Sequence, residues 1–258
     1  MNKEAPIKSS QLSTFKGKEN YGESTEYNEI MSVIKIIASG MAFLSSFDCK
    51  KALECFQSLP KNHFESPYVL SKVGMAHFEL GNYKQAEYYF LLLRKVDSCY
   101  IYGLEIYSSV LWHLKKETEL SNLSKEVLGM TKSNPIGWCI AGNSFSLLKQ
   151  HSNAMKCLKR CVQIDESFYY AFTLLGHEGI ITENFDQSVE FFKSAISINP
   201  RHYNAWYGLG VIYLRQEKYD LSEYYFKKAV AINSGNAVLL CNLGIVNFFF
   251  ISGLRPSI

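Results

Sequence analysis

Two groups of residues have types and spacings that could support chemistry. Cys157 and Cys161 are four residues apart, so a helix would place both thiols on one face, where two metal ligands can lie. His177 and Glu178 are adjacent, but neighbours on a helix do not face each other, which argues against an acid–base pair. Cys161 also falls at a position that holds alanine in the next repeats described below. A packed thiol is therefore the better interpretation.

Known catalytic motifs are missing from the sequence. We find no P-loop, no dinucleotide-binding glycine pattern, no nucleophile elbow and no HExxH, and the six histidines are scattered. We therefore predict a protein that is not an enzyme, with no catalytic residue, no metal and no cofactor.

The composition excludes several other classes. Of 258 residues, 47% are hydrophobic and 14% aromatic, which excludes a wholly disordered chain. The 27 basic and 24 acidic residues give a net charge of +3, too balanced to predict a nucleic-acid partner. The N-terminus lacks an apolar signal region, so we expect a reducing intracellular compartment. We expect no membrane span, because the nearest candidate, Ile245 to Leu254, is only about ten residues long, where about twenty are needed.

Glycine recurs in units of 34 residues counted from Val33. The eighth position of successive units is Gly40, Gly74, Ser108, Gly142, Gly176, Gly210 and Gly244. The twentieth position is mostly small: Ala52, Ala86, Leu120, Ala154, Ser188 and Ser222. The twenty-fourth is mostly aromatic: Phe56, Phe90, Ser124, Leu158, Phe192 and Phe226. Because glycine makes up only about 7% of average sequences, this register is not accidental.

The pattern has a physical reason. A helical glycine costs about 1 kcal/mol relative to alanine, so a recurring one needs a compensating contact. Two antiparallel helices approach closely only at small side chains. We expect the glycine to face the small residue at the twentieth position, with the aromatic residue filling the groove beside it. This is the tetratricopeptide repeat (TPR) consensus, and its best copy runs from Asn204 to Tyr213.

The sequence therefore predicts an all-α fold, a right-handed superhelical solenoid of antiparallel helix pairs. We expect residues 1–28 to be a disordered linker or tail and residues 29–244 to be the array. The repeats start near Val33, Pro67, Ile101, Pro135, Tyr169 and Tyr203, with a partial seventh from Ala237. Residues 245–258 form a divergent apolar tail, and Gly253 and Pro256 should stop any helix there. The repeat from Ile101 is degenerate but keeps helical apolar spacing.

Four stretches are more specific than the repeat. They are EIYSSVLWHLKK (105–116), NPIGWCIAGNSFSLLKQH (134–151), YAFTLLGHE (170–178) and NPRHYNAWYGLG (199–210). In order and spacing they resemble the C-terminal repeats of subunit three of the anaphase-promoting complex, the cell-division-cycle protein twenty-seven family. KALECFQSLP (51–60) resembles the start of that block.

The resemblance implies a non-catalytic scaffold of a ubiquitin ligase in the nucleus and cytoplasm, acting in the cell cycle and mitosis. It implies partners among the other ligase subunits, and a groove that receives Ile-Arg C-terminal tails of activator and core subunits. The family's N-terminal homodimerisation block has no counterpart here, and the divergence after Ile245 suggests a fragment or truncated isoform.

A groove for such a tail needs donors for the carboxylate, acceptors for the guanidinium and an apolar slot for isoleucine. The first helices should present their second, fifth, ninth and twelfth positions to the groove. In the middle repeats these are Ile136, Cys139, Asn143, Ser146, Tyr170, Thr173, His177, Ile180, Asn204, Tyr207, Val211 and Leu214. By the resemblance, Asn143 in Ala-Gly-Asn matches the family's tail-binding asparagine. We predict a peptide site of Asn143, Ser146, His177, Glu178, Asn204 and Tyr207.

Two other functions fit a repeat array. A generic adaptor or cochaperone that binds acidic tails needs a basic residue at the fifth position beside the asparagine, where this chain has Cys139. The substrate arm of a repeat-containing transferase would need a catalytic domain, which does not follow Ile258. Either way, Tyr170 or Tyr207 could instead pack between hairpins.

Overall fold

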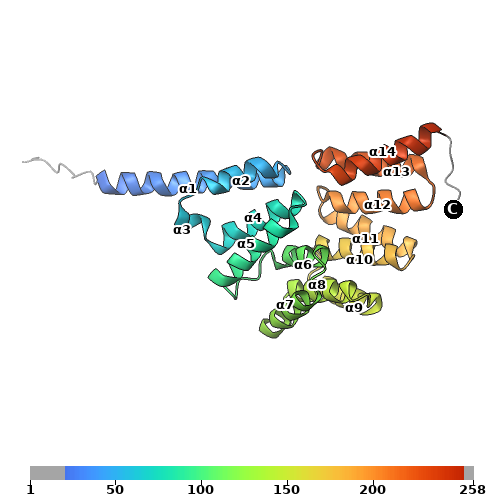
Figure 1. Cartoon of the computed structure of the whole chain (residues 1–258), viewed down its shortest axis with the longest axis horizontal. Coiled ribbons are helices and arrows are strands. Elements are labelled where there is room, and N and C mark those ends of the chain that lie inside the picture. The colour runs from blue at the N-terminus through green and yellow to red at the C-terminus, as the bar shows by residue number, and fades with distance from the viewer. Residues whose placement is uncertain (1–20, 253–258) are drawn as a thin grey trace, which may run out of the picture.

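The chain is described by a computed structural model that covers residues 21–252, with side chains from 27 to 249. The predicted tail segments 1–20 and 253–258 lie outside the described residues. From residue 21 to residue 252 every regular element is a helix, which confirms the all-helical prediction (Figure 1).

The helices form consecutive antiparallel hairpins, and a short helix, α3, follows the first hairpin. Their bounds are α1 Tyr21–Ser45, α2 Cys49–Gln57, α3 Lys61–Phe64, α4 Pro67–Glu79, α5 Tyr83–Val96, α6 Leu104–His113, α7 Glu117–Met130, α8 Pro135–Leu147, α9 His151–Ile164, α10 Tyr169–Ile181, α11 Phe185–Ile198, α12 Tyr203–Arg215, α13 Tyr219–Ile232 and α14 Ala237–Ser252. Five first helices start where the 34-residue spacing places them, at Pro67, Pro135, Tyr169, Tyr203 and Ala237.

Local signals explain the helix boundaries. The side chains of Ser66 and Asn134 accept hydrogen bonds from backbone amides in the first turns of α4 and α8, each of which begins with proline. Each complete hairpin turns through one residue with a left-handed backbone. These residues recur every 34 positions at Phe47, Gly81, Lys115, Lys149, Glu183 and Glu217, with φ between 57° and 73°. Only one of the six is glycine, so the packing of the hairpins holds the other five there.

The recurring glycine lies directly under the ring at the twenty-fourth position. A Cβ added at Gly176 would lie 2.6 Å from the ring of Phe192, and one at Gly210 would lie 2.6 Å from the ring of Phe226. Gly142 makes the same contact with Leu158. We expected the glycine to face the small residue at the twentieth position. The residue at the twenty-fourth position is instead its closest contact. These rings are fully buried and form the centre of each hairpin.

Three boundaries differ from the sequence prediction. Helix α1 starts at Tyr21, so residues 21–28, expected to be disordered, are helical, because they extend the first helix without a proline. Helix α6 starts at Leu104 rather than near Ile101, because Gly103 has a left-handed backbone with φ of 90°. Helix α14 continues to Ser252, so residues 245–252 of the predicted tail belong to the last helix.

The degenerate repeat forms a hairpin, as predicted, but it packs differently. Ser108 and Ser124 replace the glycine and the ring, so α6 and α7 have no aromatic contact at that point. Helix α7 packs more extensively on α8 than on α6. Leu120 and Val127 are completely buried, which keeps this repeat within the continuous core.

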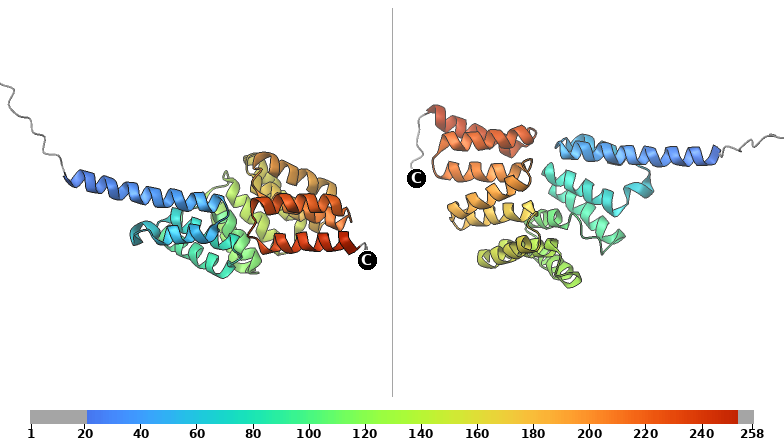
Figure 2. Two further views of the ribbon diagram at one scale, coloured as in Figure 1. Left: turned by 90° about the horizontal axis from the view of Figure 1, so that it is seen from above. Right: turned by 180° about the vertical axis from the view of Figure 1, so that it is seen from behind.

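Helix α1 corrects the expectation about membrane spans. Among the described residues, Tyr27–Ser45 is a 19-residue stretch long and apolar enough to cross a membrane by length and composition. Both views of Figure 2 show α1 projecting from the end of the array. Its C-terminal half packs through Ile37 and Met41 against the core of the first repeats. That half therefore serves as an ordinary hairpin helix.

The two ends of the array meet across the superhelical turn (Figure 1). The ring of Phe47, in the α1–α2 turn, packs edge-on against Tyr203 of α12, with centroids 5.2 Å apart. The Tyr203 hydroxyl donates to Glu79 Oε2 at 2.8 Å, and Arg201 Nη2 donates to the Ser45 carbonyl at 2.9 Å. We call these five residues the closing contact.

Candidate functional site

The first helices curve around one cavity of about 840 Å³. It is lined by residues from α4, α6, α8, α10 and α12, from the start of α14 and the first turns of α2 and α5, and from the α1–α2, α4–α5 and α13–α14 turns. All six residues of the predicted peptide site lie on its wall: Asn143, Ser146, His177, Glu178, Asn204 and Tyr207. The repeat spacing therefore predicted correctly that side chains from three consecutive hairpins lie on the wall of one cavity.

Three of the other predicted groove positions do not reach the cavity wall. Ile136 is buried, and Cys139 is completely buried against Leu158 and Cys161. Leu214 is half-buried but is not part of the wall. The first turn of α8 faces its neighbours more than the cavity, because the degenerate repeat brings α6 and α7 against it.

Asn143 is held in place by the repeat before it. The side chain is 4% exposed, and its Nδ2 donates to Ser108 Oγ at 2.8 Å and to Ser109 Oγ at 3.1 Å. Ser109 Oγ is also 2.7 Å from the hydroxyl of Tyr170. Because both amide hydrogens are used within the protein, Asn143 can offer a ligand only its carbonyl oxygen. The expectation that this amide both donates and accepts is corrected accordingly.

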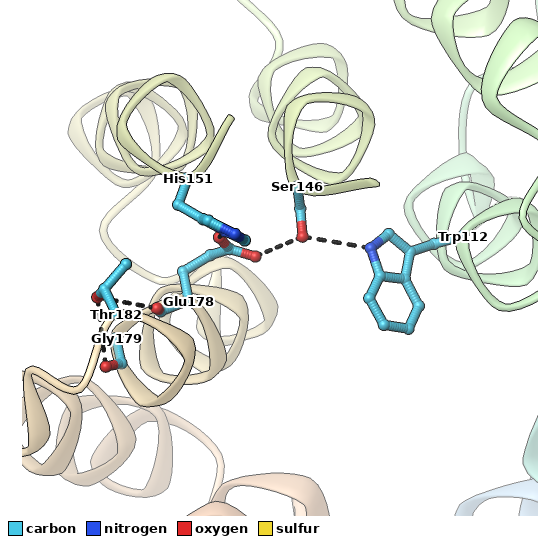
Figure 3. A network of polar contacts seen from close by, with 6 residues as sticks. All are labelled: Trp112, Ser146, His151, Glu178, Gly179 and Thr182. Carbon is cyan, nitrogen blue, oxygen red and sulfur yellow. Dashed lines mark hydrogen bonds and ion pairs between the residues drawn. The ribbon is translucent and has the colours of Figure 1, made fainter. Parts of the chain in front are cut away.

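Glu178 lies at the centre of a polar network (Figure 3). It accepts hydrogen bonds from Ser146 Oγ and, at 2.8 Å, from His151 Nδ1. Ser146 in turn accepts from Trp112 Nε1 at 3.2 Å. These contacts satisfy a carboxylate that is only 4% exposed, and its partner is His151 rather than the adjacent His177. A guanidinium that binds here would therefore contact a Glu178 and a Ser146 that already form hydrogen bonds within the protein.

The remaining predicted residues make the wall less polar than their types suggest. Burial lowers the pKa of His177 to about 4, so the imidazole is neutral at pH 7. Its ring lies edge-on to Phe192, with centroids 5.2 Å apart. Burial also raises the pKa of Tyr207, whose ring lies 5.7 Å from that of Phe226. Tyr207 thus both lines the cavity and packs between helices.

The cysteine pair forms part of the core. Cys161 is completely buried, and burial raises its pKa to about 12, which keeps the thiol protonated. This confirms that Cys161 packs as a small residue. Within the part of the chain that the structure describes, no group of three or more His, Cys, Asp or Glu side chains could hold a metal ion.

Comparison with known proteins agrees with the geometry. The tetratricopeptide repeat family matches residues 137–168, 169–202 and 203–236. Anaphase-promoting complex subunit 3 of Schizosaccharomyces pombe is 41% identical over 173 residues, which are 65% of this chain and 26% of that protein. Cell division cycle protein 27 homolog of Homo sapiens is 46% identical over 136 residues, 53% of this chain and 16% of that protein.

The chain is similar in sequence to the anaphase-promoting complex subunit 3 and cell division cycle protein 27 relatives. It spans about a quarter or less of the length of these relatives. Protein bimA of Emericella nidulans is 40% identical over 62% of this chain and 20% of its own length. The resemblance of the four sequence stretches to this family is therefore confirmed.

Solved structures share the fold. The crystal structure of the APC/C hetero-tetramer Cut9-Hcn1 matches with a TM-score of 0.72 over 79% of this chain and 39% of that chain, at 16% identity. The thermophilic TPR protein TTC0263 of Thermus thermophilus matches with a TM-score of 0.61 over 71% of this chain and all of its own, at 15% identity. At these identities the matches establish a TPR superhelix.

Sequence reasoning missed the cavity residues at the thirteenth repeat position, two of which, Glu79 and Arg215, are charged. This last residue of the first helices also lines the cavity, as Glu79, His113, Ile181 and Arg215. Burial raises the pKa of Glu79 to about 7, although the hydrogen bond from Tyr203 lowers it. Lys50, from the first turn of α2, adds a second cation. The 34-residue register contained this signal, since the thirteenth position follows directly after the twelfth.

Proposed function

We propose that this chain is a non-catalytic TPR arm of the anaphase-promoting complex, the ubiquitin ligase that acts on cell-cycle proteins in the nucleus and cytoplasm. One relative is named as subunit 3 of that complex, and the chain is 41% identical to it over 173 residues. Other subunits of the complex are its proposed partners. One observation carries the proposal furthest, namely that the six groove residues line one cavity within the array.

We propose further that the cavity receives the Ile-Arg C-terminal tails of activator and core subunits. A terminal arginine needs acceptors, and Glu178, Glu79 and the Asn143 oxygen lie on the wall. The terminal carboxylate needs donors, which Asn204, Lys50 and Arg215 can supply. The apolar slot for isoleucine is formed by Ile180, Ile181 and Val211. Both charges of the tail and its apolar side chain thus have partners in one cavity.

A titration of the chain with a fluorescent peptide ending in Ile-Arg-COOH tests the proposal. Asn143→Ala should weaken binding by about 1–3 kcal/mol, because a charged group of the peptide loses an acceptor. Asn153→Ala, on the exposed face of α9, is the matched control and should bind as the parent does. Equal affinities of parent and Asn143→Ala would remove Asn143 from the site.

Two altered peptides separate the parts of the proposal. A peptide ending in a carboxamide should bind at least about tenfold more weakly, because it lacks the terminal charge. A peptide ending in Ile-Glu should not compete. Binding of all three peptides with similar affinity would contradict tail recognition while leaving membership of the complex open to a pull-down of the other subunits.

A further inference from the structure

The first helix of the degenerate repeat forms hydrogen bonds with the residues that line the cavity. This helix, α6, carries Ser108, Ser109 and Trp112 at the eighth, ninth and twelfth positions of its repeat. All three side chains form hydrogen bonds with side chains of α8. In α4 the same positions hold a glycine, a methionine and a phenylalanine, whose side chains have no N–H or O–H group. The polar residues of α6 therefore make contacts that the corresponding residues of α4 cannot make.

Ser108 fixes which end of the Asn143 amide faces the cavity. A hydroxyl group has one hydrogen, and the Ser108 hydroxyl donates it to the Glu105 carbonyl at 2.6 Å. Towards Asn143 it can therefore only accept, so the 2.8 Å contact must be made by the amide nitrogen Nδ2. Ser108 is completely buried and is not part of the cavity wall. The carbonyl oxygen of Asn143 is thus the atom that remains for a ligand.

Trp112 acts on a second acceptor, Glu178, through Ser146 (Figure 3). The indole N–H can only donate, and Ser146 Oγ accepts it at 3.2 Å while donating its own hydrogen to Glu178 Oε1. The indole is itself held in place, because Lys115 Nζ lies 4.1 Å from the centroid of its ring. Asn143 and Ser146 are three residues apart and share one face of α8. The two acceptors that contact α6, directly or through Ser146, therefore lie on the same side of the cavity.

Acceptors that cannot turn favour a ligand that carries only donors. The guanidinium of arginine presents five N–H donors in a planar fork and has no acceptor. The urea group of citrulline has nearly the same shape, but it is neutral and carries a carbonyl oxygen. That oxygen would face the oxygen of Asn143 or the carboxylate of Glu178. An amide that is free to turn could offer its Nδ2 to the urea oxygen, whereas an amide held by Ser108 cannot.

We propose that Ser108 and Trp112 are positioning residues of the cavity, which hold the acceptor atoms of Asn143 and Glu178 so that the site selects a guanidinium over a neutral group of the same shape. This role rests on the proposed binding of Ile-Arg tails. Each residue acts through a hydrogen bond to another side chain of the wall. The degenerate repeat thus sets the selectivity of a site whose acceptors belong to the next two repeats.

The test compares two fluorescein-labelled peptides, one ending in Ile-Arg-COOH and the other in Ile-citrulline-COOH. The parent chain should bind the arginine peptide about tenfold or more tightly, because only arginine brings a charge to the carboxylate. Ser108→Ala frees the amide to turn and should reduce this preference by about threefold to tenfold. Trp112→Phe keeps an aromatic ring, removes the N–H and should act to the same degree. Neither variant should weaken binding of the citrulline peptide, whereas a general loss of structure would weaken both peptides alike.

Ser222→Ala is the matched control for the loss of a buried hydroxyl. Ser222 is completely buried, and its hydroxyl donates to the Gly210 carbonyl at 2.9 Å, but neither residue is part of the cavity wall. This variant should keep the preference of the parent for arginine. Circular dichroism should show parental helicity for all three variants. If Ser108→Ala loses helicity, Trp112→Phe decides.

Three results would overturn the proposed positioning, and only the last would also overturn tail binding. The first is the same preference for arginine in the parent, Ser108→Ala and Trp112→Phe, which would show that the acceptors need no positioning. The second is a loss of affinity for both peptides by the same factor, which would mean that the two residues only support the fold. The third is no binding of either peptide to the parent up to about millimolar concentration.

Discussion

The substitution Gly208→Ala tests whether ring packing or helix propensity dominates in this array. Alanine should favour the helix by about 1 kcal/mol over glycine. However, the new Cβ would lie 2.2 Å from Cζ of Phe192. The ring cannot retreat, because Gly176 lies against the same ring at a corresponding 2.6 Å, and Phe192 is completely buried. Overpacking of a core by one methyl group costs about 1–3 kcal/mol.

The packing penalty of about 1–3 kcal/mol should exceed the helix gain of about 1 kcal/mol, so we expect Gly208→Ala to lower the free energy of unfolding by up to about 2 kcal/mol. Gly129→Ala is the matched control, because an added Cβ meets nothing there. It should raise stability by up to about 1 kcal/mol. Urea unfolding followed by circular dichroism measures both. Stabilisation by both substitutions would refute the packing argument.

A second substitution isolates the contact. Phe192→Leu should relieve the crowding in the Gly208→Ala background, because Leu158 already occupies the equivalent position beside Gly142. The double variant should therefore be more stable than the sum of the two single changes predicts, by about 1 kcal/mol. Simple additivity would show that the methyl group added at position 208 and the ring do not meet.

Three further predictions concern backbone, burial and pH. Lys149→Gly should raise stability by about 0.5–1 kcal/mol by relieving a φ of 58°, whereas Gly81→Ala should lower it by about 1 kcal/mol, both read from thermal unfolding. Tyr203→Phe removes the hydroxyl that donates a hydrogen bond to Glu79, so it should lower the free energy of unfolding by about 1–3 kcal/mol. It should also raise the pKa of Glu79 further above about 7, which carboxyl NMR can measure. Because burial lowers the pKa of His177 to about 4, its contribution to stability is present above about pH 6.5 and is lost as the pH falls towards 4. Urea midpoints at pH 7 and pH 5 should therefore differ less in His177→Phe than in the parent.

Periodicity predicted the parts of the structure that repeat. Pro67 and Pro135 are both signs of the register and causes of the helix starts, since proline suits the first helical turn and Ser66 or Asn134 caps it. The groove residues followed from the same spacing, because one helix face recurs in every hairpin. Their role in binding stays a prediction.

Features outside the register could not be predicted from it. Gly103 shortens α6 through a left-handed backbone, whereas Gly137, at the same repeat position, is an ordinary residue within α8. Ser108 occupies a position that holds glycine in the other repeats, and its hydroxyl accepts a hydrogen bond from the Asn143 side chain. The pairing of Glu178 with His151 joins two different hairpins, and a repeat pattern describes each hairpin separately.

The closing contact changes how the array transmits a disturbance. In an open solenoid each repeat influences only its two neighbours, so a local change fades along the chain. Here Phe47 touches Tyr203, which also holds Glu79, so the first and sixth repeats are neighbours in space despite their separation in sequence. The energetic connectivity is that of a circle, with two routes between any pair of repeats. By thermodynamic linkage, a molecule held inside this circle and the contact that closes it must strengthen or weaken each other to the same degree.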